Sequence, residues 1–222
     1  MDWTAPIDIY CERVSAGFWA EPVNAISNVA FLAVGAWGLS AAMRAEKSDW
    51  MASCLAGLVI VIAIGSFLFH TFADRWSAVA DVLPISLFIY CYLTLVLFRF
   101  LRLGGLATLA TLIGFFALSL LIERLLFPLI AGSAAYVPAL SALWALGGLL
   151  RWKGHRAAGS LLGAGWLFLV SLGLRTLDEP LCGVWPVGTH FLWHILNAAT
   201  LALLLDAALR YRNSRRTQVM DI

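Results

Sequence analysis

The sequence predicts an all-α membrane protein, a seven-transmembrane helix bundle with its N-terminus outside and its C-terminus in the cytoplasm. The chain has 222 residues, of which 62% are hydrophobic and only 13% charged, about half the charged share of an average soluble domain. Apolar runs of roughly 20 residues, the length that a helix needs to cross a bilayer, recur from end to end. Lysine and arginine also gather in alternate connections between these runs, which indicates one direction of insertion.

The first three spans are apolar runs bounded by polar residues. Asn24–Met43 follows an acidic N-terminal segment and is closed by Arg44. Trp50–His70 contains no acidic residue, lysine or arginine, and Asp81–Phe98 contains none after its first residue. Each run is long enough to cross the hydrocarbon core as a helix.

Four further spans complete the predicted bundle. Gly104–Leu121 is free of charge, whereas Ala134–Leu150 contains Pro138, which interrupts the helical pattern. Arg156–Leu174 is rich in glycine, and Thr189–Leu209 begins with two histidines before it becomes apolar. The connections are short, so we expect one domain over residues 1–222.

The distribution of basic residues gives the orientation. One set of alternate connections, together with the C-terminal tail, holds 11 of the 15 lysines and arginines, and the other side holds 4. Because basic loops stay in the cytoplasm, residues 1–23 are predicted to be an outer N-terminal segment and residues 210–222 a cytoplasmic basic tail. Residues 1–23 lack the apolar core of an export signal, so the first span is expected to act as its own insertion signal. A net charge of +2 gives no reason to expect a nucleic-acid partner.

Three of the four histidines fall at one predicted depth, near the outer ends of the spans. His70 closes the second span, while His190 and His194 open the seventh and share a helix face. Three imidazoles and a water form the open tetrahedral site that catalytic zinc uses, and Asp81, at the outer start of the third span, would orient that water and move protons. Alternatively, the histidines are helix-end residues that bond to neighbours or face lipid headgroups. Ionisable residues inside membranes are usually functional, which favours zinc.

Three motifs carry a family resemblance. The stretches "SFLFHTFADRWSAVADVLP", "HFLWH" and "CER…FWAEPVNAISN" together resemble the alkaline ceramidases, seven-span zinc amidases in the superfamily that includes adiponectin-receptor-like proteins. The resemblance implies that His70, His190 and His194 bind zinc and that Asp81 contacts the zinc-bound water. It also implies that Ser66, one turn before His70, contacts the zinc-bound water or a substrate oxygen; there it could donate to a developing oxyanion. Without the resemblance, Ser66 reads as a packing serine bonded to its own helix backbone.

The segment "IDIYCERVSAGFWAEPVNAISN" resembles the family's calcium-binding stretch. The implied ligands are the hard oxygens of Asp8, Glu12 and Glu21, with a backbone carbonyl near Tyr10. The family pattern runs Asp-aromatic-Cys-Glu-x-Asn, whereas here an isoleucine stands directly before the tyrosine and a valine replaces the asparagine. Glu21 is equally well interpreted as a carboxylate at a helix N-terminus.

The four cysteines divide by predicted location. Cys54 and Cys91 lie inside spans and are predicted to be buried thiols. Cys11 and Cys182 both fall on the outer, oxidising side. The resemblance points to a disulfide between them, which would tie the N-terminal segment to the loop before the seventh span.

These residues and the resemblance predict a zinc-dependent intramembrane amidase that hydrolyses ceramide or another N-acyl lipid to a fatty acid and a sphingoid-type amine. Its partner would be a membrane lipid at the outer (periplasmic, lumenal or extracellular) face, with no obligate protein partner. One alternative is a seven-helix receptor or transducer with a structural zinc, which would need larger cytoplasmic loops. Another is a transporter or channel, for which we would expect mid-membrane charges or paired broken helices.

Overall fold

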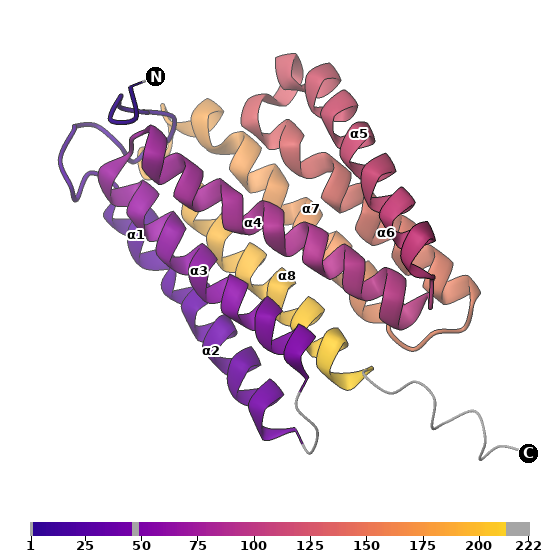
Figure 1. The fold of residues 1–222 in the computed structure, drawn as a ribbon. Coiled ribbons are helices and arrows are strands. Elements are labelled where there is room, and N and C mark those ends of the chain that lie inside the picture. The colour runs from indigo at the N-terminus through magenta and orange to yellow at the C-terminus, as the bar shows by residue number, and fades with distance from the viewer. Residues whose placement is uncertain (1, 46–48, 212–222) are drawn as a thin grey trace, which may run out of the picture.

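The computed structural model describes residues 2–45 and 49–211, which form a bundle of long helices (Figure 1). No strand occurs in these two ranges. Lys47 and most of the predicted basic tail, residues 212–222, lie outside the described residues. The helical elements are α1 (Pro22–Ser27), α2 (Val29–Arg44), α3 (Trp50–Phe72), α4 (Arg75–Leu95), the π-helical turn η1 (Val96–Phe100), α5 (Gly105–Ile130), the 3-10 helix η2 (Ala131–Tyr136), α6 (Val137–Trp152), α7 (Ala158–Leu181) and α8 (His190–Arg210).

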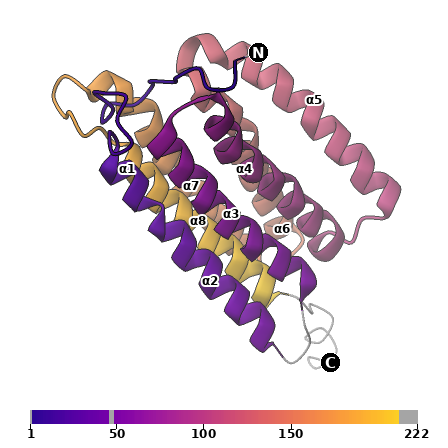
Figure 2. The ribbon, with the colours of Figure 1, turned by 60° about the vertical axis from the view of Figure 1, so that its left-hand side comes forward.

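Six helical stretches in the described part of the chain are long and apolar enough to cross a membrane, where the sequence predicted seven spans. The difference lies in Gly105–Trp152, a continuous helical stretch of 48 residues that joins α5, η2 and α6. In Figures 1 and 2 the chain reverses at η2, so that α6 runs back beside α5. Pro138 does not break this region; it stands in the first turn of α6, where a missing N–H costs nothing.

Several helices extend beyond the predicted spans at the N-terminal end of the bundle. The helix α4 starts at Arg75, six residues before the predicted Asp81, because Asp74 and Ser77 form a reciprocal capping box. The helix α5 continues past Leu121 to Ile130, and α7 continues past Leu174 to Leu181. Asp81 therefore lies in the second turn of a helix and not at its start.

The helices α3 and α8 form the centre of the bundle, and α5 lies at its edge (Figure 2). About half of the apolar window of α3 and of α8 is buried, at 50% and 56%, against 6% for Gly105–Trp152. Cys54 and Cys91 are exposed, so the prediction of buried thiols is wrong. A residue inside a span still faces outward when it lies on the side of the helix that no neighbour covers.

Close packing between α3 and α4 occurs at Gly65. A side chain at this position would collide with the carbonyl oxygen of Ala80 on α4. Only glycine allows the two backbones to approach this closely. The contact brings the next residue of α3, Ser66, beside the turn of α4 that carries Asp81.

Candidate metal centre

Three histidines meet at the end of the bundle that the N-terminal segment covers. His70 stands in the last turn of α3, His190 is the first residue of α8, and His194 follows one turn later. The three residues are enclosed, with exposed fractions of 0%, 2% and 2%. One ring nitrogen from each histidine lies within 4.8 Å of one ring nitrogen of each of the other two. No other group of three or more histidine, cysteine or acidic side chains that could hold a metal ion occurs in the described ranges. The predicted convergence of these three residues is confirmed.

Hydrogen bonds to the outer ring nitrogens orient two of the histidines. His70 Nδ1 lies 2.6 Å from Glu21 Oε2, and His194 Nδ1 lies 2.7 Å from Ser27 Oγ. A partner on Nδ1 fixes the ring and leaves Nε2 free to act as a ligand. His70 Nε2 is in fact buried without a hydrogen-bond partner among the described residues.

His190 is held by different contacts. Its ring stacks on Tyr10 with 3.7 Å between centroids, and its Nδ1 is buried without a hydrogen-bond partner in the described part of the chain. Buried imidazole nitrogens without partners call for an explanation, and a bound cation supplies one. Neutral imidazole is a preferred zinc ligand, so the donor set fits the metal that the sequence predicted.

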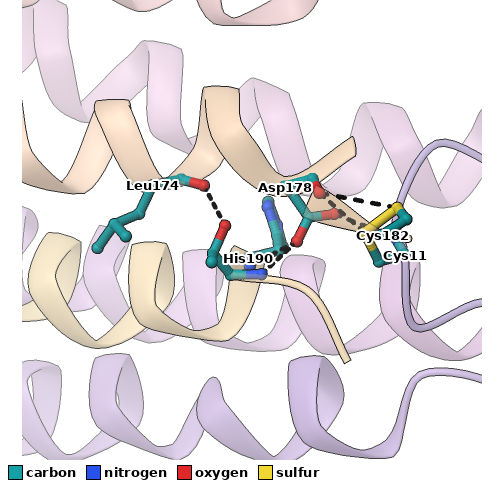
Figure 3. Close-up of a disulfide and its surroundings, with 6 residues drawn as sticks. Cys11, Leu174, Asp178, Cys182 and His190 are labelled. Carbon is teal, nitrogen blue, oxygen red and sulfur yellow. Dashed lines mark hydrogen bonds between the residues drawn. A yellow bond between two sulfur atoms is a disulfide. The ribbon is translucent and has the colours of Figure 1, made fainter. Parts of the chain in front are cut away.

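A buried carboxylate positions the first turn of α8 (Figure 3). Asp178 Oδ1 accepts hydrogen bonds from the backbone N–H groups of Thr189 at 2.6 Å and His190 at 2.8 Å. These are unpaired donors at a helix N-terminus, where negative charge is also favourable. The hydroxyl of Thr189 donates to the carbonyl of Leu174 on α7, so three hydrogen bonds join α7 to the start of α8.

The predicted disulfide between Cys11 and Cys182 is present, with 5.1 Å between the Cα atoms (Figure 3). It joins residues 171 positions apart and lies beside Asp178, whose Oδ2 accepts from the N–H of Cys11 at 3.0 Å. Gly188 completes this junction. Its φ of +70° favours glycine, and an added Cβ would collide with the Asp178 carboxylate and with Cys11.

Asp81 and Ser66 lie on the wall of a small polar cavity next to the histidines. This cavity, of about 280 Å³, is lined in part by Ser66, Asp81, His190 and His194. Ser66 also interacts directly with the Asp81 carboxyl group. Asp81 Oδ1 is buried and has no hydrogen-bond partner among the described residues, so it is available to a bound molecule.

Arg175 contributes a positive charge to the same cavity. Its guanidinium donates to Ser133 Oγ at 2.8 Å and to the Tyr10 hydroxyl at 3.4 Å, and it lies over the rings of Tyr136 and Trp193. Burial raises the pKa of Tyr10, so its hydroxyl stays protonated. The hydrogen bonds and ring contacts of Arg175 are with neutral groups, which leaves its charge directed at the cavity and at Asp81.

A larger apolar cavity adjoins the polar one. Its empty space is about 750 Å³, including the part that opens to the surroundings, and the two cavities share Ile62, Ile85, Tyr136 and Asn197 as lining residues. From this shared wall it extends along α4, α6 and α8 to residues such as Leu204. The arrangement places a small polar cavity against an apolar one, as in sites that bind amphipathic ligands.

Both oxygens of the Glu21 carboxylate, a predicted calcium ligand, have partners within the protein. Its Oε1 pairs with Arg13 Nε at 2.5 Å, and its Oε2 accepts from Asn24 Nδ2 at 3.1 Å as well as from His70. Burial alone would raise the pKa of Glu21, but the hydrogen bonds from its three partners outweigh burial and hold the pKa below its ordinary value.

The other predicted calcium ligands either have hydrogen-bond partners in the protein or are exposed. The two Glu12 oxygens accept from the backbone N–H groups of Val23 and Asn24, at 2.7 and 2.8 Å, and so cap α1. The Tyr10 carbonyl accepts from a backbone N–H at 3.2 Å, and Asp8 is exposed. Calcium needs six to eight converging oxygens, and these residues do not fit that requirement.

Four residues of the site were missed at the level of sequence: Arg13, Ser27, Arg175 and Asp178. Arg175 and Asp178 fell in a stretch interpreted as a loop, yet both belong to the last turns of α7. Arg175 stands three residues before Asp178 and four before Glu179, and this spacing of opposite charges was an available signal that the stretch is helical. Arg13 directly follows Glu12 in an acidic segment, and its sequence context gives no sign of a role beyond its charge.

Among models of protein families, one matches this chain. The model described as Ceramidase matches residues 2–219, nearly the whole chain. No curated protein matches the chain.

Proposed function

The chain belongs to the ceramidase family, and on that premise we propose that it is a zinc-dependent amidase that cleaves ceramide or a related N-acyl lipid within the membrane. The products are a free fatty acid and a sphingoid-type amine. The observation that carries the proposal is the buried group of three histidines beside Asp81 and an adjoining apolar cavity.

His70, His190 and His194 hold the zinc ion. When bound, zinc acts as a Lewis acid that activates water at neutral pH and polarises the amide carbonyl. Contacts with Glu21 and Ser27 fix the orientation of the His70 and His194 rings, whose Nε2 atoms would then be available to the ion. The adjoining polar cavity leaves a position beside the three histidines that no protein ligand fills, as a catalytic site requires and a structural site with four protein ligands does not.

Asp81 is the general base and then the general acid. It takes a proton from the attacking water and returns it to the amide nitrogen as the C–N bond breaks, so that one water is consumed for each amide cleaved. Ser66 donates its hydroxyl hydrogen to the carbonyl oxygen as negative charge develops there. Arg175 adds positive charge to the same chamber.

The acyl chain lies in the apolar cavity. This cavity extends from the polar cavity beside the histidines to residues of α4, α6 and α8 farther along the bundle. The amide then reaches the metal while the headgroup remains at the end of the bundle that the N-terminal segment covers. Only the polar end of the lipid leaves the hydrocarbon environment.

The bundle crosses the membrane seven times, with α5 and α6 as separate crossings. A straight helix of 48 residues would measure about 72 Å, more than twice the roughly 30 Å hydrocarbon core. The Cys11–Cys182 disulfide beside the histidines supports an outer location for the active site, since disulfides persist in oxidising compartments. The C-terminus is then cytoplasmic.

Fatty-acid release by the purified protein tests this function. We would offer a panel of N-acyl sphingoid lipids to the wild type, His194→Ala and the control His155→Ala, which changes the one histidine outside the metal group. We expect release by the wild type and the control and none by His194→Ala. Release by all three proteins would contradict the proposal. Bound zinc without release from any lipid amide would favour the receptor with a structural zinc.

A further inference from the structure

We propose that Arg13 is a built-in cation of the metal centre: it holds Glu21 against His70 and makes the centre independent of calcium. This inference rests on the proposed zinc site. It replaces the calcium ion that the family resemblance implied with a guanidinium group of the chain itself.

Arg13 bridges the two residues that it would position. Its Nε pairs with Glu21 Oε1 at 2.5 Å, and its Nη2 donates to the backbone carbonyl of His70 at 3.3 Å. The Arg13 and Glu21 side chains are only 5% and 2% exposed. A third contact, from Nη1 to the carbonyl of Ser15 at 3.3 Å, anchors the guanidinium to the N-terminal segment.

Glu21 transmits this contact to the metal ligand. Its second oxygen lies 2.6 Å from His70 Nδ1, so Arg13, Glu21 and His70 form a continuous chain from the N-terminal segment to the centre. A carboxylate on the outer nitrogen of a ligating histidine fixes its tautomer and raises its basicity. Arg13 balances the charge of this carboxylate, which would otherwise be buried without a cation beside it.

The same contacts leave no place for calcium. Both Glu21 oxygens have partners, both Glu12 oxygens cap α1, and the Tyr10 carbonyl accepts from the backbone N–H of Arg13. A divalent cation at Glu21 would also face the positive charge of Arg13 at close range. The guanidinium therefore supplies the positive charge at the position where the resemblance implied an ion.

Cobalt binding is the test, because its absorption bands report the metal centre without requiring turnover. We would titrate Co²⁺ into metal-free wild type, Arg13→Met, Arg13→Lys and the control Arg75→Met, which removes an exposed arginine from the adjacent start of α4. The titrations would be run with millimolar Ca²⁺ and with a calcium-selective chelator. Fatty-acid release would be measured in parallel in buffers that hold free zinc constant.

We expect the wild type to bind Co²⁺ equally well with and without calcium. In Arg13→Met, Co²⁺ affinity should fall by about 10- to 100-fold, the usual cost of losing a partner of a ligating histidine. It should recover in part in Arg13→Lys, and also in Arg13→Met when guanidinium ion is added. Arg75→Met should match the wild type.

Two results would overturn the proposal: an increase in wild-type affinity or release on adding calcium, or unchanged affinity in Arg13→Met. The wild-type measurement stays decisive even if Arg13→Met fails to fold. If Co²⁺ binding depends on Arg13 while no lipid amide is cleaved, the role of Arg13 is supported and the amidase function fails.

Discussion

At the scale of single residues, each histidine of the centre is held by a different kind of partner. An anion holds His70, a hydroxyl holds His194, and a stacked aromatic ring holds His190. Because the partners come from the N-terminal segment and α1, the proposed metal ligands on α3 and α8 are oriented by a part of the chain that contributes no histidine to the group. Asp81 and Ser66 line the small cavity beside the histidines together with Tyr10.

Asp81→Asn should abolish proton transfer without removing the metal. The amide cannot serve as a base, so we expect turnover to fall by about 100- to 10,000-fold, while zinc content stays at the wild-type level. Fatty-acid release and metal analysis on the same preparation check this. Loss of zinc together with turnover would assign Asp81 to metal binding instead.

Ser66→Ala should slow hydrolysis by roughly 100- to 1,000-fold through the loss of one donor to the carbonyl oxygen. The matched control is Ser86→Ala on α4, a partly exposed serine whose hydroxyl donates to the carbonyl of Val82 on the same helix. The effect should appear in kcat, since the hydrogen bond strengthens as charge develops. Equal rates for the two variants would leave Ser66 as a packing residue.

At the scale of elements, the start of α8 is the junction on which the centre depends. Asp178 from α7 accepts from its first N–H groups, the disulfide fixes the N-terminal segment beside it, and Gly188 turns the chain into the helix. His190 is the first residue after this turn. A shift of the junction would therefore move His190, one of the proposed metal ligands.

Gly188→Ala should destabilise the protein by about 1–3 kcal/mol, because alanine is strained at positive φ and its Cβ would collide with Asp178. We expect a lower midpoint of thermal unfolding and weaker metal binding. Gly183→Ala, in the same loop with open space around it, is the control. Identical unfolding curves for both variants would show that Gly188 is not required.

At the scale of the whole molecule, the polar and apolar cavities together suggest how a lipid is accommodated. The metal centre occupies one end of the bundle, and the apolar cavity extends from it between the helices. The exposed helix α5 covers little of the core, with only Thr108 buried. The apolar cavity is lined mainly by α4, α6 and α8, and α5 contributes Phe115 to its wall.

Ala142→Phe should shift chain-length preference toward shorter acyl groups, because Ala142 lines the apolar cavity and the larger ring would fill part of it. Ala145→Phe places the same ring on the exposed side of α6 and serves as the control. Competition between short- and long-chain N-acyl lipids measures the shift. An unchanged preference in Ala142→Phe would mean that the acyl chain binds elsewhere.

Sequence patterns predicted the helical bundle and the histidine group, and the disulfide came with the family resemblance. Apolar length marks a span, and the i, i+4 spacing of His190 and His194 marks a shared face. Neither pattern shows which residues meet across distant elements, such as Arg13 with His70 or Asp178 with Cys11. The start of α4 was missed because its capping box, Asp74 with Ser77, lies in a mixed polar stretch.

Metal removal and return is the most direct test of a zinc-dependent lipid amidase. The purified protein would be stripped of metal, assayed for fatty-acid release from ceramide, and assayed again as zinc is added back in known ratio. Our account predicts that release disappears with the metal and returns in proportion to zinc, reaching its full rate at one ion per chain. Release that persists in the metal-free protein would contradict it.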